Sequence, residues 1–498
     1  MRPRPLVLTG LALAAAAVPA RAQGYRLVLD GRMQQVAFRG WQPDSVLRTT
    51  VGAGPGGGFI SPDGFAVQCR QENWCQFFRP GQVQNSLPVA GTADLTMWGV
   101  GIRGVRLHAM FRAAADAGDA PYRPAAQLFE GYAEYQSGAF TGRLGRQTFA
   151  SRLGFTGFDG AQASYRFGDG GMFEATAYGG LGLAPNMGIS IGNVNTVPLG
   201  DFAPPSRQLV AGAMVGMAGR NADLKLEYQR QVDRDARKLF GERAALSGSV
   251  RPFERWSVTG GAWYDLVTRQ VGTAELSLRY GTPTVQLSAF GRRYQPWFDL
   301  WQIWMAFNPA ANEGVGATAT VQALPGVSVR GRAEAFRFEI AGGDSPLVRA
   351  EREGWRWATG VLVTQVPRWT FDAGAVFERG PGAAGRSFDA SVSWRPRDEL
   401  AVRTYGSRLD RPLEYRFNDA RVTWAGLELD WTVNRTLAVG GGLVRLWETR
   451  ARPDAAAFDW AQTRAIARVT LLLDSGGADR LDLPRATRRM PSTTRFGQ

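Results

Sequence analysis

The only histidine of this 498-residue chain, His108, is the residue best suited to acid–base chemistry. A histidine beside a serine or an aspartate can serve as the general base of a hydrolase. Arg106, His108 and Arg112 share one face of an alternating segment, and Leu107 and Phe111 lie on the other. We therefore expect His108 to lie among cations on a polar face, without the acidic partner that orients a catalytic imidazole. The sequence predicts no catalytic residue.

A glycine-rich run, Gly99-Val100-Gly101-Ile102-Arg103-Gly104, has the spacing of a dinucleotide-binding turn. In such a turn the glycines bring a pyrophosphate against the first turn of a helix. The residues that follow the run alternate as in a strand, so no helix receives the phosphates. We interpret the run as a tight turn between strands and expect no cofactor.

The first residues are typical of an exported protein. Two arginines precede an apolar stretch over residues 6–18, and small residues follow, which predicts a cleavable secretory signal over residues 1–22. The only cysteines, Cys69 and Cys75, lie close together, and an oxidising compartment favours a local disulfide between them. A metal site needs more ligands than this chain clusters, so we expect none.

Charge and hydropathy exclude two other classes. The formal net charge is +14, but the arginines are spread along the whole chain instead of forming a block, so we expect no nucleic-acid partner. After the signal, no stretch reaches the roughly 20 apolar residues of a membrane helix. The informative pattern is therefore an alternation of apolar and polar residues.

That alternation runs from about residue 92 to residue 474. Leu224, Leu226 and Tyr228 point one way, for example, while Lys225 and Glu227 point the other. This period is expected of strands that have lipid on one face and water on the other.

Short turns alternate with longer connections between these strands. Longer, irregular connections are expected near residues 184–206, 297–313, 340–351 and 450–458. The expected tight turns contain glycine, proline, asparagine or aspartate and lie at residues 101–104, 137–138, 169–171, 219–221, 252–254, 281–283, 325–326, 367–368, 396–399 and 434–435.

Ten hairpins give 20 strands, residues 460–474 add one, and residues 25–41 are the best candidate for another. The sequence thus predicts an all-β fold, a single transmembrane antiparallel β-barrel of about 22 strands, with 20–22 favoured, because closed bacterial barrels have even strand numbers.

The expected organisation has four parts. A signal over residues 1–22 precedes an N-terminal segment, 23–91, the barrel occupies 92–474, and a disordered basic tail covers 475–498. Within the second part, residues 42–90 are rich in glycine and proline and contain a hairpin of residues 65–69 against 75–78. This piece could cap or plug a pore, form an external stapled loop or, if residues 25–41 stay in the periplasm, belong to an accessory domain.

The signal, the alternating strands and the aromatic residues near strand ends resemble those of bacterial outer-membrane porin-like barrels. The resemblance is one of architecture, and it implies outer-membrane lipids and the barrel-assembly machinery as partners. Two departures stand out. The chain ends Arg495-Phe496-Gly497-Gln498 instead of on a strand with a terminal aromatic residue, and the segment ahead of Thr92 is too short for the plug of an energised transporter.

Charged residues on the polar faces are the candidate pore lining. Arginines there would attract anions, or would form arginine–glutamate pairs that brace the wall without selecting a solute, and the sequence leaves both open. The candidates are Arg106, His108, Arg112, Glu130, Glu134, Arg330, Arg332, Glu334, Arg403, Glu428, Arg464 and Arg468.

Aromatic clusters at residues 297–304 and 355–357 would form sugar-stacking platforms or, as we favour, lie at a membrane interface. The leading hypothesis is an outer-membrane channel for passive diffusion of small polar or anionic solutes, not an enzyme. The alternatives are an occluded barrel with a binding or structural role and, third, a lipid hydrolase that uses His108. Oligomeric state is not predicted.

Overall fold

The computed structural model describes residues 24–475 apart from 55–57, 70–71, 119–124, 184–207, 235–236, 296–310, 340–352, 381–382, 411–418 and 452–458. The expected signal, nearly all of the expected tail and the aromatic cluster at 297–304 lie outside these residues. Among the described residues, no helix is long and apolar enough to cross a membrane.

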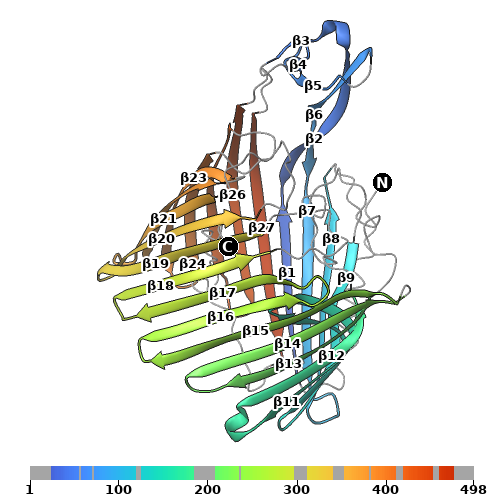
Figure 1. The fold of residues 1–498 in the computed structure, drawn as a ribbon, viewed down its shortest axis with the longest axis vertical. Helices are drawn as coiled ribbons and strands as arrows, with labels where there is room; N and C mark the ends of the chain where they lie inside the picture. Colours follow the sequence, from blue (N-terminus) through green and yellow to red (C-terminus); the bar gives the residue numbers. More distant parts are fainter. Residues whose placement is uncertain are drawn as a thin grey trace.

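The chain forms a closed sheet of 22 strands, in which neighbouring strands pair antiparallel throughout (Figure 1). The expected fold is therefore confirmed. The strands are β1 (Gly24–Gln34), β7 (Pro88–Trp98), β8 (Val105–Asp116), β9 (Ala125–Ser137), β10 (Phe140–Ser151), β11 (Gly154–Phe167), β12 (Phe173–Gly182), β13 (Gln208–Ala218), β14 (Ala222–Asp233), β15 (Leu239–Phe253), β16 (Trp256–Asp265), β17 (Gln270–Gly281), β18 (Val285–Tyr294), β19 (Asn312–Leu324), β20 (Val327–Phe338), β21 (Glu353–Val363), β22 (Trp369–Gly380), β23 (Ala383–Arg397), β24 (Leu400–Asp410), β25 (Asp419–Thr432), β26 (Leu437–Ala451) and β27 (Trp460–Asp474).

Strand β1 closes the wall, because it pairs with β27 on one side and with β7 on the other. At this closure Ser475 N donates to Tyr25 O at 3.1 Å, and Tyr25 N donates to Ser475 Oγ at 2.9 Å. The wall thus includes β1 and begins its second strand at Pro88, four residues before the expected boundary at Thr92.

All ten expected tight turns connect neighbouring strands at one rim. Glycine makes two of them possible: Gly138 and Gly326 adopt positive φ angles of 57° and 75°, where a side chain would be strained. The opposite rim carries the longer connections, as expected, with two exceptions of two residues each, between β10 and β11 and between β22 and β23. Below, these are the tight-turn rim and the long-connection rim.

Polar and apolar side chains are distributed over the two faces of the wall in the reverse of the way usual in a soluble protein: polar side chains are buried and apolar ones are exposed. Glu227, Gln229 and Arg243 are only 5%, 1% and 6% exposed, whereas Leu226 and Leu246, on the other face of the same strands, are 56% and 49% exposed. Contiguous exposed apolar surface of this extent needs a nonaqueous partner. The polar face lines the interior, and the apolar face forms the outside.

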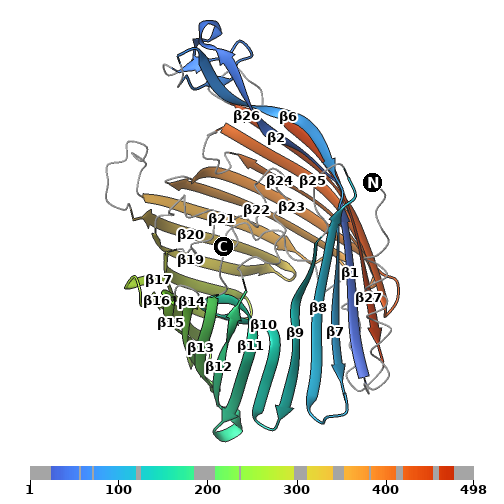
Figure 2. The same cartoon turned by 90° about the vertical axis from the view of Figure 1, so that its right-hand side faces the viewer.

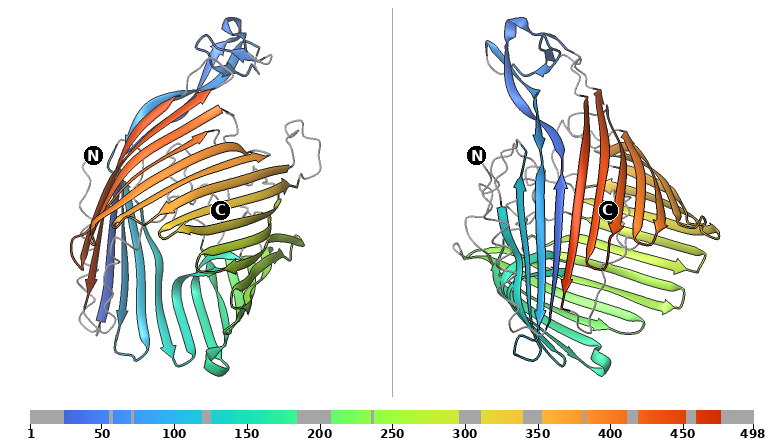
Figure 3. Two further views of the ribbon diagram at one scale, coloured as in Figure 1. Left: turned by 90° about the vertical axis from the view of Figure 1, so that its left-hand side faces the viewer. Right: turned by 180° about the vertical axis from the view of Figure 1, so that it is seen from behind.

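A two-stranded ribbon continues β1 and β7 beyond the long-connection rim. It consists of β2 (Val36–Leu47) and β6 (Trp74–Ser86), which pair along their length. The base of the ribbon contacts β27 through Arg39, and Figures 2 and 3 show its tip standing clear of the barrel. The described part of residues 42–90 therefore does not plug the lumen, and the single strand expected over residues 25–41 is two strands that separate at Gln35.

The ribbon ends in a small sheet of β3 (Gly52–Ala53), β4 (Phe59–Ile60) and β5 (Ala66–Val67). The expected disulfide between Cys69 and Cys75 is present, and the expected hairpin is reduced to a single bridge between Gln68, just after β5, and Gln76 in β6. Val67, Cys75 and Phe77 form its buried cluster. The tip thus has its own small core, separate from the barrel wall.

Candidate functional site

The candidate site is the inner face of the barrel, and the strand register defines it. Residues opposite one another on antiparallel strands share a face, so the face of buried Glu334 can be followed from strand to strand around the wall. All twelve residues proposed from the sequence as pore lining fall on this inner face.

An ion-pair ladder covers the inner face of β18–β22. Glu334, whose side chain is fully inaccessible, accepts from Arg292 at 2.5 Å and from Arg332 at 2.8 Å. Next to it, Arg330 pairs with Asp372 at 2.7 Å. Such charge-assisted bonds fix the arginine side chains against the wall. Further along the ladder, the next pair is Arg356 with Glu378 at 2.6 Å.

Most of the remaining candidates also meet charged or polar partners, across strands or along the same strand. Glu134 accepts from Arg143 at 2.8 Å, and Glu428 accepts from the Tyr405 hydroxyl at 3.0 Å. Arg464 contacts Gln462 at 3.1 Å. Other members of the set continue the pattern: Arg468 pairs with Asp430, Arg403 lies opposite Glu428, and Arg106 lies opposite Glu134. Bracing by pairing therefore predominates on this face.

The sequence missed the most enclosed part of the lumen. Arg152 and Leu153, the two residues that join β10 to β11, fold inward and are called the inward turn below. The Arg152 guanidinium donates to Glu275 Oε1 at 2.9 Å and to Gly261 O at 2.8 Å, while its backbone N–H donates to Glu227 Oε2 at 2.9 Å. These partners lie on β17, β16 and β14, so the inward turn reaches across several strands.

Buried polar residues hold the inward turn from below. Arg243 donates to Leu153 O at 3.1 Å and to Gln229 Oε1 at 2.6 Å. Gln229 in turn donates to Thr156 Oγ1 at 2.6 Å and to the Tyr178 hydroxyl at 3.1 Å. Beside this network, three apolar side chains pack into a small interior cluster: Phe158, Tyr178 and Val210. Side chains therefore fill this part of the lumen.

The surroundings of His108 correct an expectation. Its Nε2 lies 3.1 Å from Glu130 Oε2, and its Nδ1 lies 3.2 Å from Thr96 Oγ1 and 3.6 Å from Asp94. The expected cationic neighbourhood without an acidic partner is thus wrong, because β7 and β9 bring two carboxylates to the imidazole. Hydroxyl, imidazole and carboxylate are the groups of a nucleophilic hydrolase. Here the hydroxyl is a threonine, and all of these groups face the lumen.

Aromatic side chains form two bands on the outer face. Near the long-connection rim, Trp357 stacks on Phe377 with ring centroids 4.3 Å apart, and Trp355 is 45% exposed. Near the tight-turn rim, Trp369 stacks on Trp394 at 5.6 Å. Paired bands of this kind mark the two interfaces of a bilayer. The outward position of the cluster at 355–357 supports its interfacial interpretation.

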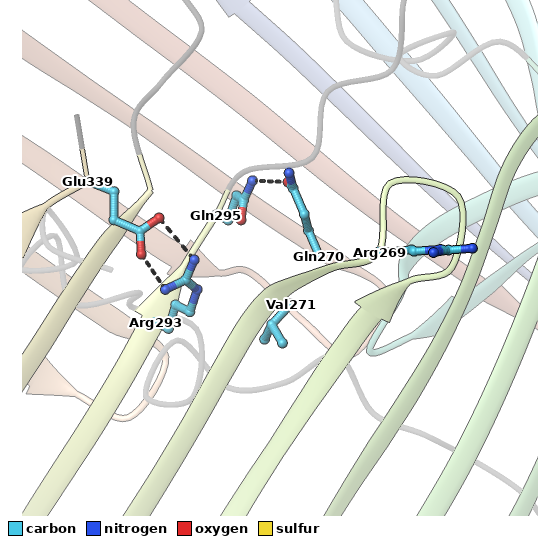
Figure 4. Close-up of a pocket in the computed structure, with 6 residues that line it drawn as sticks. All are labelled: Arg269, Gln270, Val271, Arg293, Gln295 and Glu339. Carbon is cyan, nitrogen blue, oxygen red and sulfur yellow. Dashed lines mark hydrogen bonds and ion pairs between the residues drawn. The ribbon is translucent and has the colours of Figure 1, made fainter. Parts of the chain in front are cut away.

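A pocket of about 390 Å³ lies where β17 begins and β18 ends (Figure 4). Its lining includes Arg293, which binds Glu339 through two bonds of 2.5 and 3.0 Å, and Gln295, which donates to Gln270 at 2.6 Å. Arg293 and Glu339, and likewise Gln295 and Gln270, are thus already paired with each other. We assign no ligand to this pocket. Within the described ranges, no group of three or more histidine, cysteine, aspartate or glutamate side chains could hold a metal ion.

No protein-family model matches the chain, and no curated protein sequence matches it. Among solved structures, it is similar to OccAB2 of Acinetobacter baumannii, with 9% sequence identity, a TM-score of 0.41 and coverage of 91% of this chain and 98% of that one. It is also similar to OccD3 of Pseudomonas aeruginosa, with 9% identity, a TM-score of 0.38 and coverage of 92% and 93%. A third similar structure is a mutant of the ferric enterobactin receptor PfeA of Pseudomonas aeruginosa, with 11% identity, a TM-score of 0.46 and coverage of 91% of this chain and 81% of that one. At these TM-scores the likenesses identify no function for this chain.

Proposed function

We propose that the chain spans the bacterial outer membrane and forms a channel through which small polar solutes diffuse passively. The observation that carries the proposal is the closed 22-stranded wall with an apolar outer face and an ionised inner face. An ionised interior needs water, and an apolar exterior with two aromatic bands needs lipid. Outer-membrane lipids and the barrel-assembly machinery are the partners of such a protein, and the signal over residues 1–22 would export it.

The width of the barrel favours permeation. A circular barrel of 22 strands, spaced by about 4.8 Å and tilted by about 40°, measures roughly 40 Å between opposite backbones. The inward turn and the side chains beneath it narrow one side of that space. Solutes would therefore be sieved by the opening that remains beside the inward turn, bounded by the ion-pair ladder.

The proposed selectivity is a weak preference for anions. On the inner face of β18–β22, four arginines face three carboxylates: Arg292, Arg330, Arg332 and Arg356 against Glu334, Asp372 and Glu378. A single surplus positive charge raises the local anion concentration only modestly in a wide, hydrated pore. We expect an anion-to-cation permeability ratio on the order of 2.

Conductance in planar bilayers tests both parts of the proposal. The refolded mature protein should give stable open steps, with an anion-biased reversal potential in a salt gradient. Arg332→Gln should lower the anion preference, because its guanidinium faces the lumen. Arg337→Gln is the matched control: it lies on the same strand but on the outer face, and should leave the reversal potential unchanged. Equal effects of both variants would contradict the assigned inner face.

An occluded barrel is the second candidate, favoured by the inward turn and by the plugged lumen usual for outer-membrane transporters of 22 strands. The same recordings separate the two. A protein that inserts but stays closed would exclude passive diffusion and favour a binding or structural role. The third hypothesis, a lipid hydrolase, is disfavoured because His108 faces the lumen, whereas lipid acyl chains would contact the opposite face of β8.

A further inference from the structure

Three arginines converge on one aspartate where β23, β24 and β25 reach the long-connection rim. Arg386 Nε lies 3.0 Å from Asp410 Oδ2, while Arg408 Nε and Arg421 Nε lie 3.0 and 2.8 Å from Oδ1. The Asp410 side chain is 10% exposed, but those of the arginines are 58%, 44% and 52% exposed. We call these four residues the outer arginine cluster.

The outer arginine cluster faces away from the lumen. Asp410 lies opposite Arg386 on β23 and opposite Arg421 on β25, so the three share one face. Alternate residues of a strand share a face, so the same face continues along β23 to Phe388 and along β25 to Leu427. These two side chains are 44% and 47% exposed. In the proposed membrane orientation, these guanidinium groups face lipid at the edge of the apolar surface.

The charge of this cluster is not balanced by protein groups shown to contact it. Other outward-facing ion pairs are balanced: Arg146 meets Asp159, and Arg293 and Arg337 together meet Glu313 and Glu339. Among the side chains that the structure describes, three guanidinium groups here share one carboxylate. Two surplus positive charges at the lipid boundary are costly unless an anion or water neutralises them.

The height of the cluster limits what that anion is. Asp410 is the last residue of β24, and Arg421 is the third residue of β25, so the cluster lies at the level where headgroups meet the aromatic band, not in the acyl region. Guanidinium forks match the oxygens of phosphate, and a phosphate group carries up to two negative charges, equal to the surplus. Each arginine approaches Asp410 through Nε, and about half of each arginine side chain remains exposed.

Longer connections face the outside in bacterial outer-membrane barrels, so we propose that the outer arginine cluster, at the long-connection rim, binds the phosphate of a phosphorylated glycolipid in the outer leaflet. The inference rests on the proposed membrane location but not on conduction through the lumen. Bound lipid would fix the β23–β25 part of the wall against the leaflet. The site is separate from the pore, so its loss and the loss of the channel activity are distinguishable in one preparation.

Binding of diphosphoryl lipid A to the full-length protein in detergent tests this proposal, measured by native mass spectrometry and by titration. The double variant R408Q/R421Q should weaken binding at least tenfold, and the conservative R421K should weaken it less, because lysine keeps the charge but loses the fork. The control R293Q/R337Q lies on the same face at the same rim, in the balanced ion pairs, and should change binding less than twofold. Heat-modifiable gel mobility and conductance verify that each variant is folded.

Three results would overturn the proposal: unchanged binding by the folded double variant, equal loss in the control, or equal affinity for lipid A without phosphates. A competition experiment with inorganic phosphate distinguishes free phosphate from lipid as the ligand. If inorganic phosphate binds as tightly as the lipid and competes with it at similar concentration, the site recognises free phosphate and the lipid assignment is wrong. If at least a hundredfold more inorganic phosphate than lipid is needed to displace the lipid, the result supports the lipid as the ligand.

Discussion

Removing the Arg152 side chain should loosen the narrowest part of the proposed channel. In Arg152→Ala, the inward turn loses its bonds to Glu275 and to Gly261 O but keeps the backbone bond to Glu227. The turn would then leave the lumen part of the time, and the opening beside it would widen.

The magnitude follows from the exposure of the partners. The bond to Gly261 O is enclosed, since the Arg152 side chain is only 17% exposed, and contributes about 1–2 kcal/mol. Glu275 is 57% exposed, so solvent screening reduces that ion pair to about 0.5–1 kcal/mol. A total of about 2 kcal/mol corresponds to a roughly 30-fold increase in the ratio of released to docked turn.

Single-channel recording is the appropriate assay, because release of a turn appears as a second, higher conductance level. The variant should visit that level roughly 30 times more often than the unmodified protein. Arg166→Ala, which removes an exposed arginine paired with Glu174 on the neighbouring strands, is the control and should leave the levels unchanged. Identical conductance levels and dwell times in Arg152→Ala and the unmodified protein would refute the role of the inward turn.

Three other predictions concern the ribbon, the wall and His108. Replacing Cys69 and Cys75 by serine should destabilise the tip of the ribbon by about 2 kcal/mol, so that limited proteolysis cuts the tip while the heat-modifiable barrel persists; loss of the barrel as well would show that the two are coupled. Cysteine at Ser328 should react with a charged, membrane-impermeant thiol reagent in liposomes, whereas cysteine at Val329, on the outer face, should not; the reverse pattern would invert the assigned faces. His108→Ala should leave phospholipid hydrolysis at the background of the unmodified protein, and a measurable activity that this variant abolishes would restore the hydrolase hypothesis.

The wall was predictable because its signals are local. Alternation identifies a strand within a few residues, and the glycine and proline turns mark where each hairpin reverses. Even the number of strands followed, since the ten tight turns each imply a pair. The break at Gln35, where β2 leaves the wall for its ribbon partner β6, was not predicted, although the pair Gln34-Gln35 interrupts the alternation there.

The contacts of the site depend on register between strands, which a single segment does not reveal. The inward turn joins residues more than 70 positions apart, and nothing near Arg152 indicates Glu227 or Glu275. His108 differs, because the turn at Gly99–Gly104 already places Thr96 opposite it and Asp94 on the same face. Asp94 could therefore have been found from the sequence, whereas Glu130, on β9, depends on the register between β8 and β9.

The net charge of the chain does not measure the charge of the lumen. Arg386, Arg408 and Arg421 contribute to the basic total, yet they lie on the outer face. On the inner face, carboxylates nearly match the arginines of β18–β22. Each charged residue has to be assigned to the inner or the outer face before the net charge of the lumen can be used to predict ion selectivity.

The closure of the wall by β1 has a consequence for how the chain can be cut and rejoined. Because Tyr25 and Ser475 already exchange hydrogen bonds, a short linker between them would join the two sequence ends without disturbing a ladder. New ends could then be opened within a long connection, and every strand would keep both neighbours. The order of strands around the wall would be preserved in such a circular permutant, although its synthesis would begin at a different strand. A wall of this kind is a ring whose starting point is set by the gene and not by the pairing.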